Sequence, residues 1–240
     1  ILANKTYPAD FIYSNIAIQT NIIQASHLHK VKKLVFLASS CMYPKYAKQP
    51  ITESELLSGP LEPTNQAYAI AKIAGTEMCR SYYAQYNDTF VTVIPTNLYG
   101  PNDTYHPENS HVIPGLIHKF HSAKIHNDEK VELWGTGKPK REFMYVDDMA
   151  DATILVMNSY SSNEPINIGT GEDISIEELA KMIKKIVDFR GKIIFNTQYP
   201  DGTPRKQLNI EKLKQLNFES KIALEEGLRL TYQDYLENQI

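Results

Sequence analysis

The chain has 240 residues, of which 42% are hydrophobic and 22% charged, and its net charge is −3. This length and composition suit one large or two small globular domains, and the weak net charge excludes a basic platform for nucleic acid. No run approaches the roughly 20 apolar residues of a membrane span, and no signal peptide pattern opens the chain, so we expect no membrane partner. The two cysteines, Cys41 and Cys79, show no metal-binding spacing and are too few for a disulfide framework, so we expect no metal and a reducing, cytoplasmic setting.

The first hundred residues show the alternation of helix and strand that is typical of a parallel sheet. Apolar residues at helical spacing predict a helix over 10–30, and a short apolar run at 33–38 predicts a strand buried on both faces. Prolines mark 43–64 as an extended loop. A helix is expected at about 65–87 and a strand at about 90–95.

The rest of the chain alternates less regularly and has longer loops. The further predicted helices are 113–124, 148–158, 175–188, 210–216 and 222–237. The further predicted strands are 131–134, 142–146, 165–168 and 192–196. Ser175 and Glu178 form a capping-box pattern, and Asp147 is placed to cap the helix that follows it. The alternation indicates an α/β fold with a doubly wound parallel sheet and a second, smaller lobe.

Tyr68 and Lys72 lie four residues apart on the predicted helix 65–87, so they share one face. An ammonium group lowers the pKa of a nearby phenol by favouring the phenolate. A tyrosine tuned in this way can pass a proton to or from a carbonyl or alcohol oxygen during hydride transfer. The alternative for this spacing alone is a surface pair without a chemical role.

Ser39 and Cys41 follow the predicted strand 33–38, and strand alternation aims both at the same side, with Ser40 opposite. Ligands of open α/β sheets bind at the carboxyl ends of strands. There the hydroxyl can hydrogen-bond a substrate oxygen, and the thiolate can act as a base. The alternatives are a strand-end cap for Ser39 and a small buried filler for Cys41.

A strand-end serine, followed about thirty residues later by Tyr-x-x-x-Lys, resembles the extended short-chain dehydrogenase/reductase family. The motifs that resemble the GDP-L-fucose synthases of that family are 39–44, 59–65, 68–75, 95–101, 106–112, 134–137, 141–143, 146–148 and 200–206. The match runs from Tyr7 to the last predicted helix. Agreement at so many separate motifs is not credible as chance.

The resemblance implies conversion of GDP-4-keto-6-deoxy-D-mannose to GDP-L-fucose, by epimerisation at C3 and C5 and reduction of the C4 ketone with NADPH. It implies that Cys41 is the base of the epimerisation and His111 the acid. It also implies that Ser39 and Tyr68 polarise the C4 oxygen, with Tyr68 as proton donor. Lys72 would tune Tyr68 and bind the nicotinamide ribose.

The same resemblance implies further contacts. Contacts to NADP(H) would come from Ser39, Ser40, Tyr68, Lys72, Pro95, Thr96, Asn97, Leu98 and His111. Contacts to the GDP-sugar would come from Asn97, Val112, Lys119, Trp134, Arg141 and Asp201. The fork of Arg141 suits a diphosphate, and Trp134 offers a flat face, with core packing as its alternative role. Members of the family are typically homodimers, so we expect pairing through helices 10–30 and 65–87.

The glycine-rich loop that holds the pyrophosphate in such enzymes is not in this sequence, because no glycine precedes Gly59. Gly169 and Gly171 precede a helix without a third glycine at the right spacing, so we expect a turn there. The chain begins with Ile1 and its first methionine is Met42. We therefore expect an internal start, with about two βα units of about 30 residues each missing.

On this interpretation, residues 1–100 and a return strand and helix near 142–168 are the remainder of an NADP-binding Rossmann domain. Residues 101–240 are mainly a GDP-sugar-binding lobe. Without the first strands the sheet has an uncovered edge. The chain alone should then self-associate or dissolve poorly, and bind NADPH weakly.

Two other functions stay open. One is a GDP-sugar-binding module that no longer reduces its ligand, which the intact set of candidate residues argues against. The other is a different nucleotide-sugar enzyme of the same fold. A 4,6-dehydratase is disfavoured because 40–42 carry no carboxylate, and a 4-epimerase is disfavoured by the Asn-Ser-His loop at 109–111.

Overall fold

The computed structural model describes residues 6–107, 109–199 and 201–238. The chain folds into two compact units. The first consists of Ile1–Thr96, Met149–Gly171 and Leu208–Glu219. The second consists of Asn97–Asp148, Glu172–Gln207 and Ser220–Ile240.

The first unit is built on a parallel sheet in the order β1-β2-β6. Its strands are β1 (Leu34–Leu37), β2 (Phe90–Pro95) and β6 (Ile166–Ile168). The middle strand, β2, is buried at every position except Pro95, as expected for a continuous apolar run between two neighbours. The parallel α/β architecture predicted from the sequence is confirmed.

The predicted burial of the first strand on both faces is wrong. In the described part of the chain β1 pairs only with β2, so it forms an edge of the sheet. Its residues are half-buried, and Leu37 is 51% exposed. The apolar run at 33–38 reported a strand correctly, but composition alone does not distinguish a central strand from an edge strand.

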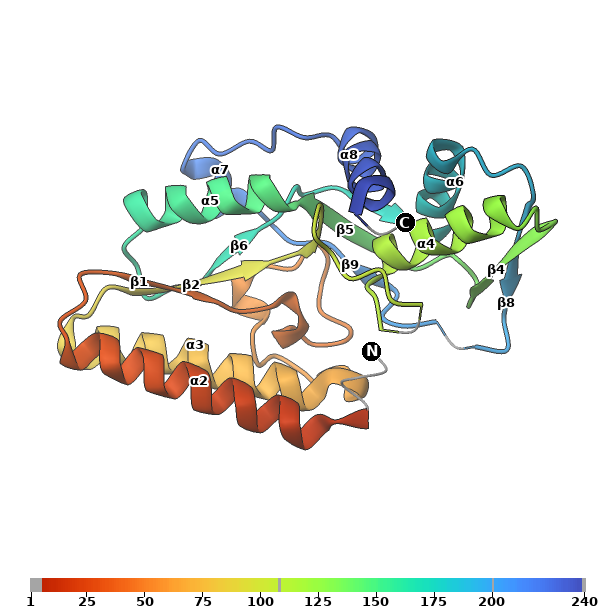
Figure 1. Ribbon diagram of the computed structural model, residues 1–240. Helices are drawn as coiled ribbons and strands as arrows, with labels where there is room; N and C mark the ends of the chain where they lie inside the picture. The colour runs from red at the N-terminus through yellow and green to blue at the C-terminus, as the bar shows by residue number, and fades with distance from the viewer. Residues whose placement is uncertain (1–5, 108, 200, 239–240) are drawn as a thin grey trace. The chain divides into compact units, whose positions relative to one another are not determined.

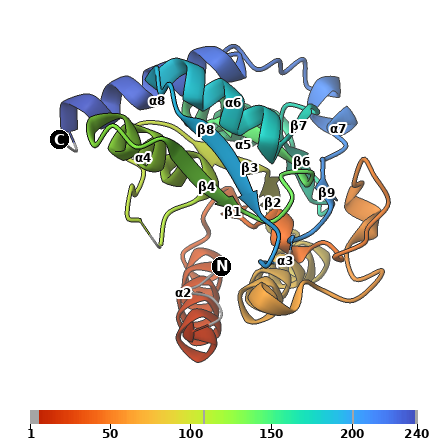
Figure 2. The ribbon, with the colours of Figure 1, turned by 90° about the vertical axis from the view of Figure 1, so that its right-hand side faces the viewer.

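Two long helices lie side by side along one face of this sheet, α2 (Pro8–Leu28) and α3 (Gln66–Tyr86), as Figures 1 and 2 show. Gln19 of α2 donates a hydrogen bond to the carbonyl oxygen of Ala71 at 2.6 Å. Gly75 permits this close approach, because a Cβ there would strike the Phe36 ring and the Gln19 side chain. Helices α5 (Val146–Ser159) and α7 (Glu211–Gln215) cover the other face (Figure 1).

The outer surface of α2 is unusually apolar. Ile23 is fully buried, whereas Tyr13, Ile18, Ile22 and Leu28 are each more than half exposed. An apolar surface of this kind on one helix commonly marks an interaction site.

A buried polar network ties the long loop after β1 to the sheet. Asn167 of β6 is fully buried and accepts a hydrogen bond from the Tyr43 hydroxyl at 2.6 Å. Its side-chain amide donates to the carbonyl oxygens of Ile51 at 2.9 Å and Asn209 at 3.0 Å. Its backbone N–H donates to the Glu53 carboxylate at 2.9 Å. The loop is therefore held in place by hydrogen bonds as much as by apolar packing.

The second unit is organised around β5 (Lys140–Tyr145). This strand pairs in parallel with β3 (Asn97–Tyr99) and β9 (Arg205–Lys206), and antiparallel with β7 (Asp173–Ser175). A separate parallel pair is formed by β4 (Lys130–Trp134) and β8 (Lys192–Asn196), which lie side by side in Figure 2. Strands β3, β7 and β9 were not predicted, because two or three residues are too few to show a period.

Three helices pack around the core of the second unit, α4 (Val112–Ile125), α6 (Ile176–Val187) and α8 (Leu224–Asn238). The predicted capping box is confirmed, since Ser175 and Glu178 each bond the backbone N–H of the other. The predicted cap at Asp147 is wrong. Helix α5 begins at Val146, two residues earlier than predicted, so Asp147 lies in its first turn, where a carboxylate interacts favourably with the positive end of the helix dipole.

Candidate active site

Cys41 lies in a short 3-10 turn, η1 (Ser40–Met42), that follows β1, and Ser39 immediately precedes this turn. Ser39 caps this turn, and its Oγ accepts a hydrogen bond from the Cys41 N–H at 3.2 Å. The predicted alternation along a strand is therefore wrong, because the chain leaves the extended conformation at the turn. Ser40 is buried and both neighbours are half-exposed, so the turn still presents Ser39 and Cys41 and hides Ser40.

The Cys41 sulfur has a polar neighbour that the sequence did not single out. Asn65, the last residue of the turn η3 (Pro63–Asn65), donates from Nδ2 to Cys41 Sγ at 3.2 Å. An asparagine immediately before a helix is usually interpreted as a cap. Asn65 makes no such capping bond to α3, a difference that only the structure reveals.

Tyr68 and Lys72 sit on the first two turns of α3, as predicted. Burial raises the pKa of Tyr68, and the neighbouring Cys41 raises it further, while a hydrogen bond with Ser39 lowers it. The net shift is upward and is dominated by burial, whereas the sequence predicted a pKa lowered by Lys72. Lys72 Nζ lies 5.8 Å from the centre of the Tyr68 ring and donates to the carbonyl oxygen of Leu37 at 3.1 Å. Burial lowers the pKa of Lys72.

The segment after β2 contributes residues to both units. Pro95 is half-buried, and Thr96 is buried with its N–H bonded to the Ile168 oxygen at 2.9 Å. Asn97 and Leu98 belong to β3 in the second unit. The Asn97 amide donates to the Glu142 carbonyl oxygen at 2.8 Å.

His111 occupies the N-cap position of α4 and is exposed. Its side chain makes no capping bond, and its carbonyl oxygen accepts from the Gly115 N–H at 2.9 Å. Val112 opens α4 and packs against the core of the unit. The imidazole is thus carried at the start of a rigid helix. Glu108, from the same motif, lies outside the described residues.

Trp134, at the end of β4, is 64% exposed, so the alternative of core packing is wrong. Its ring stacks on Tyr199 with centroids 4.4 Å apart and planes 13° apart. Lys119 Nζ lies 5.6 Å from the centre of the Trp134 ring. Tyr199 was not predicted, and its position just before the Pro-Asp-Gly-Thr segment was the available signal. Two stacked, accessible rings beside a cation form a surface suited to a flat aromatic ligand.

Arg141 and Asp201 lie in the same unit. The Arg141 guanidinium sits against the backbone of Gly202 and donates to the Lys140 carbonyl oxygen at 2.7 Å. Asp201 accepts from the Thr136 hydroxyl at 2.6 Å and from the Thr136 N–H at 2.8 Å. These two bonds hold the pKa of Asp201 below its usual value. Pro200, from the same motif, lies outside the described residues.

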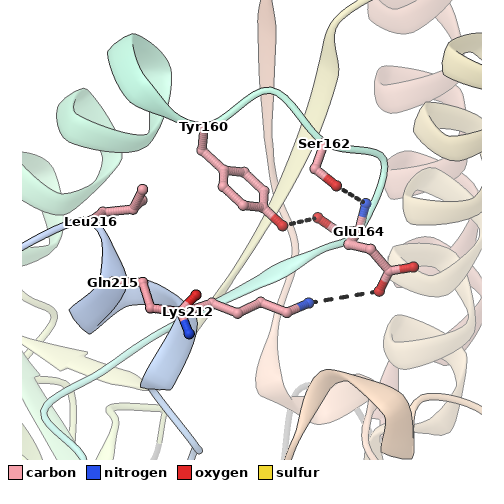
Figure 3. Close-up of a pocket in the computed structure, with 6 residues that line it drawn as sticks. All are labelled: Tyr160, Ser162, Glu164, Lys212, Gln215 and Leu216. Atoms are coloured by element: carbon pink, nitrogen blue, oxygen red, sulfur yellow. Dashed lines mark hydrogen bonds and ion pairs between the residues drawn. The ribbon is translucent and has the colours of Figure 1, made fainter.

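A separate pocket of about 300 Å³ lies in the first unit and is lined by none of the predicted residues (Figure 3). Its lysine, Lys212, pairs with Glu164 at 3.7 Å and with Glu53 at 3.8 Å. Two carboxylates neutralise that charge, so this pocket does not suit a nucleotide phosphate.

In the described ranges no group of three metal-ligating side chains occurs, and no helix is long and apolar enough to cross a membrane.

The side chains that fit one end of a nicotinamide cofactor are present in the first unit. A partly buried ammonium and a phenol on one helix face, beside a serine hydroxyl, supply donors for a ribose and for a reacting oxygen. The sequence before Gly59 holds no glycine, so it offers no glycine-rich cradle for the pyrophosphate.

Comparison with known proteins identifies the family of this chain. Residues 1–169 match the NAD dependent epimerase/dehydratase family, and the chain belongs to it. Its relatives in that family include several GDP-L-fucose synthases. The chain is 55% identical to the putative GDP-L-fucose synthase 2 of Arabidopsis thaliana, over 99% of this chain and 73% of the relative. It is 54% identical to the GDP-L-fucose synthase of Escherichia coli K12, over 100% of this chain and 77% of the relative.

Solved structures with a similar fold include two NADP-bound enzymes that act on GDP-sugars. A GDP-L-fucose synthetase from Naegleria fowleri bound to NADP matches with a TM-score of 0.90 at 34% identity, over 97% of this chain and 75% of that one. A GDP-mannoheptose C4 reductase from Campylobacter jejuni with NADP bound matches with a TM-score of 0.88 at 40% identity, over 98% and 79%.

Proposed function

We propose that this chain carries out the GDP-L-fucose synthase reaction. GDP-4-keto-6-deoxy-D-mannose is epimerised at C3 and C5 and then reduced at C4. The observation that carries the proposal is the grouping of Ser39, Cys41 and Tyr68 at the end of β1 and the start of α3. A thiol can remove a proton from a carbon beside a ketone. A phenol and a hydroxyl can donate to the ketone oxygen.

In the epimerisation, the C4 ketone acidifies the protons on C3 and C5. The Cys41 thiolate takes a proton from one carbon, and the electron pair moves into an enolate on the C4 oxygen. His111 gives a proton to the opposite face of that carbon, which inverts the centre. The resulting thiol then loses its proton, and the imidazole regains one from water, before the second centre reacts. Thiolates and imidazoles both exchange protons near neutral pH.

In the reduction, Tyr68 donates a proton to the C4 oxygen. Its raised pKa keeps the phenol protonated at neutral pH, which is the state a donor needs. Ser39 holds the phenol by a hydrogen bond and can donate to the same substrate oxygen. NADPH, when bound, supplies the hydride that reaches C4.

NADP(H) would be held at its nicotinamide end by Lys72 and Tyr68. Further contacts are proposed for Ser39, Ser40, Pro95, Thr96, Asn97, Leu98 and His111. The chain spans about three quarters of the relatives that it matches, and the glycine-rich cradle is not in its sequence.

The second unit would bind the GDP-sugar. The exposed Trp134 and Tyr199 rings offer a stacking surface for guanine, with Lys119 beside them. Arg141 would bind the diphosphate, because its fork matches phosphate oxygens. Asn97 and Val112 are further proposed contacts. Asp201 is bonded to Thr136, so its role would be to hold that loop in place beside the ligand.

This division implies the domain roles. Residues 1–100, with the strand and helix near 142–168, would serve the cofactor, and 101–240 mainly the GDP-sugar. We also propose a homodimer formed through the apolar surface of α2 together with α3, in the cytoplasm. An epimerase acting on a UDP-sugar is less favoured. UDP-glucose 4-epimerase from Thermotoga maritima is 25% identical, against 54% for the E. coli synthase.

The test is incubation of the chain with GDP-4-keto-6-deoxy-D-mannose and NADPH in deuterated water, followed by mass spectrometry of the sugar nucleotide. A reduced product with deuterium at C3 and C5 supports the proposal. Reduction without deuterium would indicate a C4 reductase instead. Deuterium without reduction would support the epimerase half alone, with cofactor binding as the missing step. Cys41→Ser should lose the deuterium in every case.

A further inference from the structure

We infer that Asn65 is a further catalytic residue, which stabilises the Cys41 thiolate and also accommodates the Cys41 thiol. The inference rests on the proposed role of Cys41 as a base. A base of this kind alternates between two states, an anion before it takes the proton and a neutral thiol afterwards. A neighbour that suits only one state would trap the residue in it.

The first observation is the contact itself. Asn65 Nδ2 lies 3.2 Å from Cys41 Sγ and donates to it. A hydrogen bond to a charged acceptor is stronger than one to a neutral acceptor, so this donor favours the thiolate. The two residues come from the turns η3 and η1, which are 24 positions apart in the sequence.

The second observation is that Asn65 does not cap its helix. It occupies the position before α3 that favours asparagine, yet its side chain makes no capping bond there. The amide is directed to the sulfur instead. Giving up a stabilising local bond for a contact with a reactive atom is typical of a functional residue.

The third observation concerns the other end of the amide. Asn65 Oδ1 is buried and has no hydrogen-bond partner among the described residues. A half-turn of the amide therefore breaks no bond on that side, and it brings the oxygen to the sulfur. There it can accept from the S–H of the neutral thiol. One side chain can thus serve both protonation states of Cys41.

The titratable groups near Cys41 do not provide a partner that suits both of its protonation states. Tyr68 lies close enough to Cys41 for Cys41 to raise the pKa of Tyr68. Lys72 lies 5.8 Å from the Tyr68 ring and donates to the Leu37 carbonyl oxygen.

The experiment is alkylation of the purified 240-residue chain with iodoacetamide across a range of pH, with Cys41 followed by peptide mass spectrometry. The thiolate displaces iodide and forms a thioether, so the rate follows the thiolate fraction. The rate at neutral pH is divided by the plateau rate at high pH, which removes differences in access. Cys79 is an internal control for folding, since it is 1% exposed and should stay unlabelled.

Two variants test the contact. Asn65→Ser keeps a good helix cap but does not reach the sulfur, and Asn65→Asp places a carboxylate beside it. We expect Asn65→Ser to lower the neutral-to-plateau ratio about tenfold, which corresponds to about 1.4 kcal/mol, near the lower end for a hydrogen bond to a charged group. Asn65→Asp should lower it further. Thr64→Ala alters the same turn without touching Cys41, and should change the ratio less than about twofold.

An unchanged ratio in Asn65→Ser and Asn65→Asp, with Cys79 still protected, overturns the inference. So does an equal decrease in Thr64→Ala. This readout needs neither substrate nor cofactor, so it is separate from the deuterium experiment. If the wild-type chain fails to exchange deuterium but the alkylation ratio falls in the variants, the contact stands and the proposed function of Cys41 fails.

Discussion

Lys72 Nζ donates a hydrogen bond to the carbonyl oxygen of Leu37, the last residue of β1, at 3.1 Å. The bond fixes the ammonium between the strand end and the Tyr68 ring, and burial lowers the pKa of Lys72. We expect Lys72→Met to weaken NADPH binding and to slow reduction. Deuterium exchange at C3 and C5 should continue, because that step does not use this group. The Michaelis constant for NADPH and the exchange rate check the prediction. Loss of both activities together would contradict it.

Tyr68→Phe removes one hydroxyl and leaves the ring in place. We expect reduction to fall by about 10²–10⁴-fold, the usual contribution of a positioned proton donor. Exchange of the C3 and C5 protons should persist. The absorbance of NADPH measures the rate of reduction, and mass spectrometry measures the exchange at C3 and C5. Tyr82→Phe on the same helix is the matched control and should retain both activities.

The single tryptophan of the chain, Trp134, provides a signal for nucleotide binding. Because it is exposed and stacked on Tyr199, we expect GDP to change its fluorescence. Tyr199→Ala should weaken GDP binding about tenfold, since aromatic stacking on a base contributes about 1–3 kcal/mol. Lys181→Ala, on the exposed side of α6, should bind GDP normally. Equal affinity in Tyr199→Ala and the wild type would remove Tyr199 from the site.

The buried thiol of Cys79 makes stability depend on alkaline pH. Burial raises the pKa of Cys79 from 9.0 to about 11. Between these values the unfolded chain has lost a proton that the folded chain keeps, so the free energy of unfolding falls as pH rises. The loss should be about 2–3 kcal/mol over that interval. Urea unfolding near pH 9 and near pH 11 measures it.

The matched variant is Cys79→Ala, which is less stable overall but should lose less stability over the same interval. Parallel losses in the wild type and the variant would assign the alkaline effect to other groups, such as the tyrosines.

The Asn167 network should be costly to break. Asn167→Leu removes the partner of the buried Tyr43 hydroxyl and the side-chain donor to the carbonyl oxygens of Ile51 and Asn209, and the Ile51 oxygen keeps only its bond from the Asn209 N–H at 2.8 Å. We expect a loss of about 3–5 kcal/mol of unfolding free energy. Tyr43→Phe removes one bond only and should cost about 1 kcal/mol. Urea denaturation of both variants checks this order, and the reverse order would contradict the network.

Much of the fold followed from local pattern. The strand predicted at 90–95 is β2 to the residue, and the helix predicted at 65–87 is α3 within one residue at each end. The capping box at Ser175 was also readable, because both partners lie within one turn. Each of these signals depends on residues close in the sequence.

The predictions that were wrong or missing depend on residues far apart in the sequence. The exposure of β1 depends on which strands pair with it, and the turn at Ser39–Cys41 depends on bonds that replace strand pairing. The contact of Asn65 with Cys41 and the stack of Tyr199 on Trp134 join residues that only the folded chain brings together. Motifs identified the chemical groups, whereas the neighbours that modify those groups required the structure.

Among the described residues one edge of β1 has no paired strand, which has a consequence for how this chain is handled. Its outward N–H and C=O groups can pair with a strand from any other chain, and the apolar surface of α2 adds to the attraction. Pairing that depends on a second molecule makes the melting temperature rise with protein concentration. Dilution would then be a destabilising condition for this chain, in the same sense as heat or urea.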